Sequence, residues 1–174
     1  CAPVKIDAVI EPVYILGDFT VEPAEKGWRI DAPVNSLTTG SWKEQGHPFY
    51  SWDVTYKKEF EIMKKSSCYK IGMGNWKGTV AELIVNGTSA GLFVLPTDKV
   101  DVTDFVTTGT NIIEVKITGS LKNLLGPHHK NPTPGFAGPG SWENIKIYPS
   151  GRDYQLLDYG LTDDFYLYEC ELKK

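Results

Sequence analysis

The stretch VTYKKEFEI, Val54 to Ile62, decides the fold class because apolar and polar side chains alternate along it. Val54, Tyr56, Phe60 and Ile62 fall on one face, and Lys58 is the single charged residue on that face. A period of two is typical of a β-strand with one buried and one solvated face. The segment NIIEVKITG, residues 111–119, repeats the pattern, so we expect an antiparallel sheet with one wet face.

Working outward, further segments of strand length are separated by Gly, Pro, Asn and Asp. They are VYILGDFTV (13–21), YKIGMG (69–74), AELIVNG (81–87), AGLFVL (90–95), ENIKIY (143–148) and DFYLYECEL (164–172). The pair Asn86-Gly87 predicts a tight hairpin, since both residues accept positive φ. In DVTDFVTTG, Asp101 or Thr103 is expected to cap one helical turn and Gly109 to end it. The pattern predicts an all-β fold, an antiparallel β-sandwich or jelly roll, as a single domain over residues 1–174.

Length and charge exclude several classes of function. A (β/α)₈ barrel enzyme needs about 250 residues, and this chain has 174. The net charge of -4, with both signs mixed along the chain, does not favour nucleic acid or an anionic membrane surface as a partner. No apolar run approaches the ~20 residues of a membrane-spanning helix, so membrane insertion is not expected.

The three cysteines, Cys1, Cys68 and Cys170, are far apart and lack metal-site spacing. We expect buried or incidental thiols rather than a disulfide. Cys1 is open to two interpretations, the acylated first residue of a bacterial lipoprotein or an arbitrary boundary within a longer protein. The second is favoured, because strand-like sequence follows almost at once.

From Gly46 onward two segments carry a family resemblance: GHPFYSWDVTYKKEFEI and NWKGTVAELIVNGTSAGLFVLPTDKVDVTDFVTTGTNIIEVKITGS. They resemble the sugar-binding-like jelly-roll domain of family 2-type glycoside hydrolases and related large bacterial polysaccharide-degrading proteins. The resemblance implies a galactose-binding-like fold, an accessory module of a larger protein, and a secreted, periplasmic or cell-surface location. It also implies that a structural calcium ion is possible by analogy with that fold.

The resemblance does not imply catalysis, because in those enzymes the paired carboxylates lie in a separate barrel domain. Glu44, Glu82, Glu143 and the pair Asp163-Asp164 are available by residue type for glycoside hydrolysis. Alternation and turn placement instead explain them as solvent-facing or capping residues. The chain alone is therefore not expected to be an enzyme.

A sugar site needs an aromatic plate for the C–H face of the ring and fixed polar groups for its hydroxyls. Two segments offer both, and their candidate ligand-binding residues are Trp42, Gln45, His47 and Tyr50 in the first, and Asn123, His128, His129 and Trp142 in the second. Each aromatic residue could pack in the core instead of stacking on a sugar ring. The two roles are evenly balanced for Trp42, and packing is favoured for Phe49, Tyr50 and Trp52.

The second segment, LKNLLGPHHKNPTPGFAGPGSW (121–142), is rich in Pro and Gly and is expected to be an ordered loop over one edge or rim of the sandwich. For His128 and His129 we favour loop-anchoring hydrogen bonds first, sugar contacts second and metal binding third.

Two hypotheses of function remain. The first is a non-catalytic carbohydrate-binding module of a bacterial glycoside hydrolase that binds a polysaccharide or oligosaccharide. The second is a structural accessory domain that packs against another domain of its parent without binding sugar. A third, fainter one is a domain that lends a loop to the parent's active site.

Overall fold

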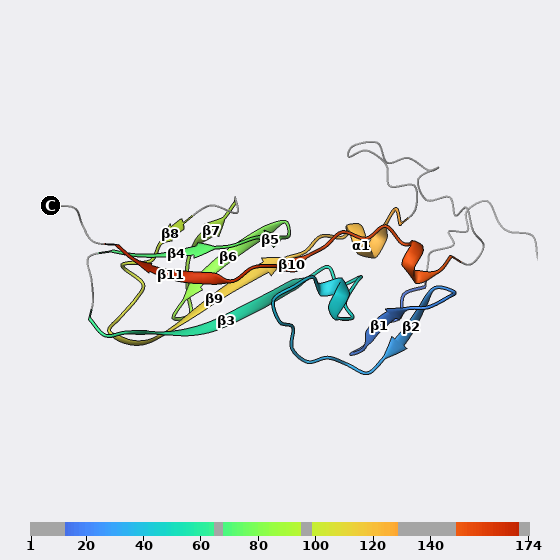
Figure 1. Ribbon diagram of the computed structural model, residues 1–174, viewed down its shortest axis with the longest axis horizontal. Coiled ribbons are helices and arrows are strands. Elements are labelled where there is room, and N and C mark those ends of the chain that lie inside the picture. Colours follow the sequence, from blue (N-terminus) through green and yellow to red (C-terminus); the bar gives the residue numbers. More distant parts are fainter. Residues whose placement is uncertain (1–12, 65–67, 95–98, 129–148, 171–174) are drawn as a thin grey trace, which may run out of the picture.

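The computed structural model describes residues 13–64, 68–94, 99–128 and 149–170. Its centre is a pair of antiparallel sheets (Figure 1). The first sheet has the order β3-β9-β6-β7, with β3 at Asp53–Ile62, β9 at Gly109–Thr118, β6 at Val80–Val85 and β7 at Thr88–Phe93. The second has the order β11-β4-β8, with β11 at Phe165–Glu169, β4 at Tyr69–Met73 and β8 at Lys99–Asp101. The short strands β5 (Trp76–Lys77) and β10 (Gly160–Leu161) form a further pair.

The core lies between the two sheets, and period-two alternation places its residues there. Every second residue of β9 from Asn111 to Ile117 is buried, as are alternate residues of β6. Ile71 of β4 and Phe165 of β11 meet them from the other layer. The expected antiparallel β-sandwich is confirmed.

Lys58, which interrupts the apolar face of β3, has a structural partner in the second sheet. Its ammonium pairs with the carboxylate of Asp164 and lies 5.1 Å from the centre of the Phe165 ring. A lysine at an inward position is tolerated because its charge is paired and its stem is only partly buried. Lys58 thus joins the two layers at their edge.

The predicted turns are confirmed. Asn86 and Gly87 have φ of 51° and 81°, and they connect Val85 to Thr88 across the β6–β7 hairpin. Asp101 accepts hydrogen bonds from the backbone and hydroxyl of Thr103, which starts a single turn in which the Phe105 amide donates to Val102. Gly109, with φ of 100°, starts β9.

The prediction of unpaired thiols is wrong for two of the three cysteines. Cys68 and Cys170 form a disulfide. They lie opposite each other one step beyond the Tyr69–Glu169 pair of β4 and β11, and the Cys170 amide donates to the Cys68 carbonyl. Strand pairing brings together two residues 102 positions apart, which no local spacing could indicate. Cys1 lies outside the described residues.

A second unit lies at the other end of the sandwich from the β7–β8 side (Figure 1). It consists of a hairpin, a 3₁₀ turn and short helical turns: β1 (Thr20–Pro23) with β2 (Trp28–Asp31), η1 (Trp42–Gln45), α1 (Lys122–Leu125) and η3 (Gly151–Asp153). No helix among the described residues is long and apolar enough to cross a membrane.

Two expectations about segments change here. The strand expected over 13–21 is wrong for its first part, because only Thr20 and Val21 belong to β1. Residues 13–16 instead carry exposed apolar side chains. The loop expected from Leu121 begins with the short helix α1 and a cis peptide before Pro127. Its remainder, 129–142, and the strand expected at 143–148 lie outside the described residues.

Candidate functional site

Trp42 is a core residue, which agrees with packing, one of the two roles that the sequence left open for it. Only 1% of its surface is exposed, and its indole Nε1 donates a 2.8 Å hydrogen bond to the Tyr56 hydroxyl. Tyr50 and Tyr159 pack against its ring at centroid distances of 5.9 and 6.0 Å. The glycine and polar neighbours of Trp42 suggested exposure, but they line a turn that folds over the core.

Gln45 holds its own loop. Its Oε1 accepts from the Thr38 amide at 2.9 Å, and its Nε2 donates to the Thr38 carbonyl at 3.1 Å and the Ser41 carbonyl at 3.4 Å. Both ends of the amide are therefore engaged within the segment 38–45. The structure assigns Gln45 to loop geometry rather than to an open ligand position.

Asn123 is 1% exposed, and its amide joins α1 to two distant segments. Its Nδ2 donates to the carbonyls of Pro48 and Leu157 at 2.9 and 2.8 Å, and its Oδ1 accepts from the Leu157 amide at 2.8 Å. The side chain of Asn123 is buried and its amide is hydrogen bonded at both ends, so it has a structural role in this fold.

His128 anchors the start of the loop, which is the role favoured from the sequence. Its Nε2 hydrogen bonds with the Asn123 carbonyl at 2.7 Å, and its ring packs against Tyr154 and Phe49 at centroid distances of 5.2 and 5.8 Å. The other two candidates of this segment, His129 and Trp142, lie outside the described residues and stay predictions.

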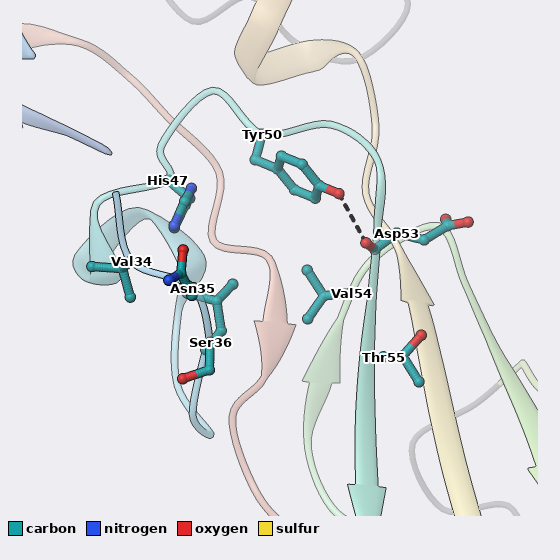
Figure 2. Close-up of a pocket in the computed structure, with 9 residues that line it drawn as sticks. Val34, Asn35, Ser36, His47, Tyr50, Asp53, Val54 and Thr55 are labelled. Atoms are coloured by element: carbon teal, nitrogen blue, oxygen red, sulfur yellow. Dashed lines mark hydrogen bonds between the residues drawn. The ribbon is translucent and has the colours of Figure 1, made fainter. Parts of the chain in front are cut away.

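His47 and Tyr50 are the two candidates that line a hollow. We call it the Tyr50 hollow; its volume is about 420 Å³ and its lining residues are Val34, Asn35, Ser36, Leu37, His47, Tyr50, Asp53, Val54 and Thr55. Figure 2 shows Asn35 and His47 on one side of it and Tyr50 above Val54 on the other. The Tyr50 hydroxyl donates to the Asp53 carbonyl at 3.0 Å, which fixes the ring at the start of β3.

Two groups in the hollow have shifted acidities. Burial lowers the pKa of the His47 imidazole, and a backbone hydrogen bond with Val34 opposes the shift. Burial and the nearby Asp53 carboxylate raise the pKa of Tyr50. Both side chains are therefore neutral at pH 7 and present uncharged hydrogen-bonding groups to the hollow.

A second, larger hollow of about 640 Å³ shares His47 and Tyr50 with the first, and most of its lining is apolar. We call its surface the apolar face; its lining residues are Val13, Tyr14, Ile15, Leu16, Gly17, Phe19, Val21, Trp28, Ile30, Gly46, His47, Pro48, Phe49, Tyr50, Ser51, Trp52 and Leu124. Leu16 is 91% exposed and Trp52 72% exposed. Residues 13–16 are apolar without alternation, which also fits an exposed apolar surface. Because the segment has the length of a strand, it was interpreted as one.

Among the carboxylates named for hydrolysis, Glu82, Asp163 and Asp164 have structural partners, and Glu44 is an exposed residue of η1. Glu82 pairs with Lys116 at 2.5 Å and accepts from Ser89, and Asp164 pairs with Lys58. Asp163 accepts from the following backbone amide, and Glu143 lies outside the described residues. No group of three or more His, Cys, Asp or Glu side chains that could hold a metal is present in the described ranges. Calcium stays a prediction from fold analogy.

Comparison with known proteins finds similarity to a small region of glycosidases. No protein-family model matches it. A putative beta-glucuronidase from Formosa agariphila is 29% identical over 133 residues, which are 73% of this chain and 11% of that protein. The resemblance inferred from the sequence is confirmed. The chain therefore resembles a small region of a much longer protein.

Two solved structures of glycosidases show likeness to this chain. A rhamnosidase from Novosphingobium sp. PP1Y superposes with a TM-score of 0.51 at 19% identity, over 90% of this chain and 16% of that one. A beta-D-mannosidase from Dictyoglomus thermophilum gives 0.46 at 19% identity, over 89% of this chain and 22% of that one. The first of these likenesses supports a β domain of the kind found within large glycosidases.

Proposed function

We propose that this chain is a non-catalytic accessory domain of a larger secreted glycoside hydrolase, and that its apolar face packs against another domain of the same polypeptide. The observation that carries the proposal is the exposure of that face. Soluble monomers seldom leave large contiguous apolar patches in water, and such patches mark interaction sites. The putative beta-glucuronidase offers a source for the partner, because 89% of its length lies outside the match.

The occupant of the apolar face is best assigned as a protein surface. Val13, Ile15 and Leu16 are aliphatic and exposed, whereas a sugar site needs hydrogen-bonding groups beside its aromatic plate. Few polar side chains line this hollow. An apolar domain surface would cover these side chains at a gain of roughly 25 cal/mol for each Å² removed from water.

The positions of three predicted sugar-binding residues favour the packing role over sugar binding through those three residues. Trp42 and Asn123 are buried, and the amide of Gln45 is engaged in its own loop. Sugar binding through these residues would require the fold to open. Packing against a neighbouring domain requires no such change.

The disulfide supports the proposed location outside the cytoplasm. Stable disulfides such as Cys68–Cys170 persist in oxidising compartments and are rare in the reducing cytosol. This agrees with a secreted, periplasmic or cell-surface parent, the location of enzymes that degrade polysaccharides.

Sedimentation velocity of the isolated chain over a range of concentrations tests the proposal. We expect reversible self-association, because the apolar face lacks its partner. The double variant Ile15→Ser, Trp52→Ser should shift the chain to monomer without loss of stability, since both side chains are largely exposed. Val94→Ser is the matched control: Val94 is 72% exposed but follows β7, away from the apolar face, and its replacement should leave the association unchanged.

Binding of an apolar dye supplies a second readout. The wild-type chain should enhance the fluorescence of anilinonaphthalene sulfonate more than the double variant does. A chain that is monomeric at every concentration and binds no dye would contradict the proposal. Equal effects of the double variant and Val94→Ser would assign the association to general stickiness rather than to this face.

A further inference from the structure

The Tyr50 hollow combines an apolar floor with polar walls. Leu37 and Val54 are partly buried against the core and form its floor. The Val54 side chain points toward Asn35 and Ser36, while Tyr50 closes the hollow from above (Figure 2). The loop 34–37 and the first residues of β3 thus border the same open hollow.

The polar groups at the walls have free hydrogen-bonding capacity. Asn35 is exposed, and its side chain has no protein hydrogen-bond partner within the described part of the chain. His47 Nε2 is buried without a partner there. The Tyr50 hydroxyl donates one bond to the Asp53 carbonyl and keeps its acceptor capacity. A buried, unpaired nitrogen is costly, so a small rotation of the imidazole toward a ligand hydroxyl would be favourable.

The charges around the hollow select against an anion. Its lining holds neither Lys nor Arg, and Asp53 is its one charged residue. In Figure 2 the Asp53 carboxylate points to the opposite side of β3 from Val54. Lys116, which the Asp53 charge attracts, is already paired with Glu82. A ligand here meets neutral donors and acceptors in a weakly negative field.

We infer that the Tyr50 hollow binds a single neutral sugar ring, with its C–H face on Leu37 and Val54 and its hydroxyls bonded to Asn35, His47 and Tyr50. The volume of about 420 Å³ lies within the usual range for small-molecule sites. Hydroxyls both donate and accept, which suits an amide, a neutral imidazole and a phenol together. The inference goes beyond the proposed packing role and uses residues other than the exposed aliphatic run at 13–16.

An NMR titration of the ¹⁵N-labelled chain tests the inference. The probes are the methyl glycosides of glucose, galactose, mannose, xylose and rhamnose, with glucuronate as the charged comparison. We expect saturable shifts with at least one neutral glycoside, confined to amides of residues 34–37, 47, 50 and 53–55. Glucuronate should bind more weakly than the neutral ring.

Two variants locate the site. Asn35→Ala and Tyr50→Phe should each raise the Kd roughly fivefold, the effect of losing one neutral hydrogen bond. Thr39→Ala is the matched control, because Thr39 is exposed in the same loop but does not line the hollow. Neither variant removes a core side chain, so the amide spectrum should keep its dispersion.

Several outcomes overturn the inference. The first is that no glycoside gives saturable shifts, and the second is that the shifts centre on residues 13–19. The third is that glucuronate binds as strongly as the neutral ring. The fourth is that Asn35→Ala titrates in the same way as Thr39→Ala. The packing proposal is judged separately by sedimentation. A chain that self-associates but binds none of these sugars would overturn the inference and leave the proposed packing intact.

Discussion

The indole Nε1 of Trp42 donates a hydrogen bond of 2.8 Å to the hydroxyl oxygen of Tyr56, and the Leu161 amide donates to the same oxygen at 3.3 Å. One buried phenol thus joins η1, β3 and β10. Gly160 supports the arrangement, because a Cβ at this position would lie 2.9 Å from the Trp42 ring. Trp42 therefore secures the N-terminal loop to the sandwich.

Tyr56→Phe is expected to destabilise the domain by about 2 kcal/mol. It keeps the ring but leaves the Trp42 indole and the Leu161 amide buried without their acceptor, at a cost of roughly 1–3 kcal/mol. Urea denaturation followed by tryptophan fluorescence measures the change. Tyr166→Phe is the control, since Tyr166 is 49% exposed, and it should have no effect. Equal midpoints for Tyr56→Phe and wild type would contradict the assigned role.

The sandwich could be predicted from the sequence because its signals are local. In β3, β6 and β9 the alternation of apolar and polar residues follows directly from having one buried face. The Asn86-Gly87 turn requires only that these two residues adopt positive φ. The prediction of a strand at residues 13–16 failed because its signal was not specific. A short apolar run suits a strand or an exposed surface equally, and only tertiary contacts decide between them.

The candidate site was less predictable because burial depends on distant partners. Asn123 is buried by the carbonyls of Pro48 and Leu157, which are 75 and 34 residues away. Trp42 depends on Tyr56 and Leu161 in the same way. His47 and Tyr50 line the Tyr50 hollow, but Asn35 lies in a polar loop whose sequence carries no sign of a site.

Loss of the disulfide should cost several kcal/mol. Cys68–Cys170 closes a loop of 102 residues, and removal of a native disulfide from a small domain typically costs about 2–5 kcal/mol. The double variant Cys68→Ser/Cys170→Ser and the reduced wild type should show the same lowered midpoint in thermal melting. Reductant should not affect the double variant. An unchanged midpoint for the reduced wild type would show that the bond contributes nothing.

Asn123→Ala should destabilise the attachment of α1 by roughly 2–3 kcal/mol, because it leaves the Leu157 amide and two carbonyls unpaired. Hydrogen exchange at the Leu157 amide is the specific readout and should accelerate strongly. Leu121→Ala is the control, since Leu121 is 54% exposed just before α1, and it should leave this exchange unchanged. Slow exchange at Leu157 in Asn123→Ala would show that another group protects that amide.

Acid should weaken the contact between η1, β5 and the segment before β10 through Asp158. The Asp158 carboxylate accepts from Lys43 at 2.9 Å, from Lys77 at 3.2 Å and from Ser41 at 3.0 Å. Hydrogen bonding by Lys43 is the largest cause of the lowered pKa at Asp158. Burial is the next largest effect and opposes the shift, and hydrogen bonds from Lys77 and Ser41 lower the pKa further. The pKa is thus lower in the folded state than in the unfolded chain.

A depressed pKa in the folded state stabilises the fold at pH values above the unfolded value of about 3.9, and the stabilisation is lost as pH falls through the folded value. Asp158→Asn should therefore be less stable than wild type at pH 7, by under about 1 kcal/mol because the group is partly exposed. The difference should shrink below pH ~3.9 and vanish in stronger acid. Urea denaturation of both proteins between pH 2 and 7 measures it, and the comparison removes the contributions of Glu82 and Asp101, whose pKa values are also lowered. A difference that stays constant across this range would show that the carboxylate charge does not stabilise this contact.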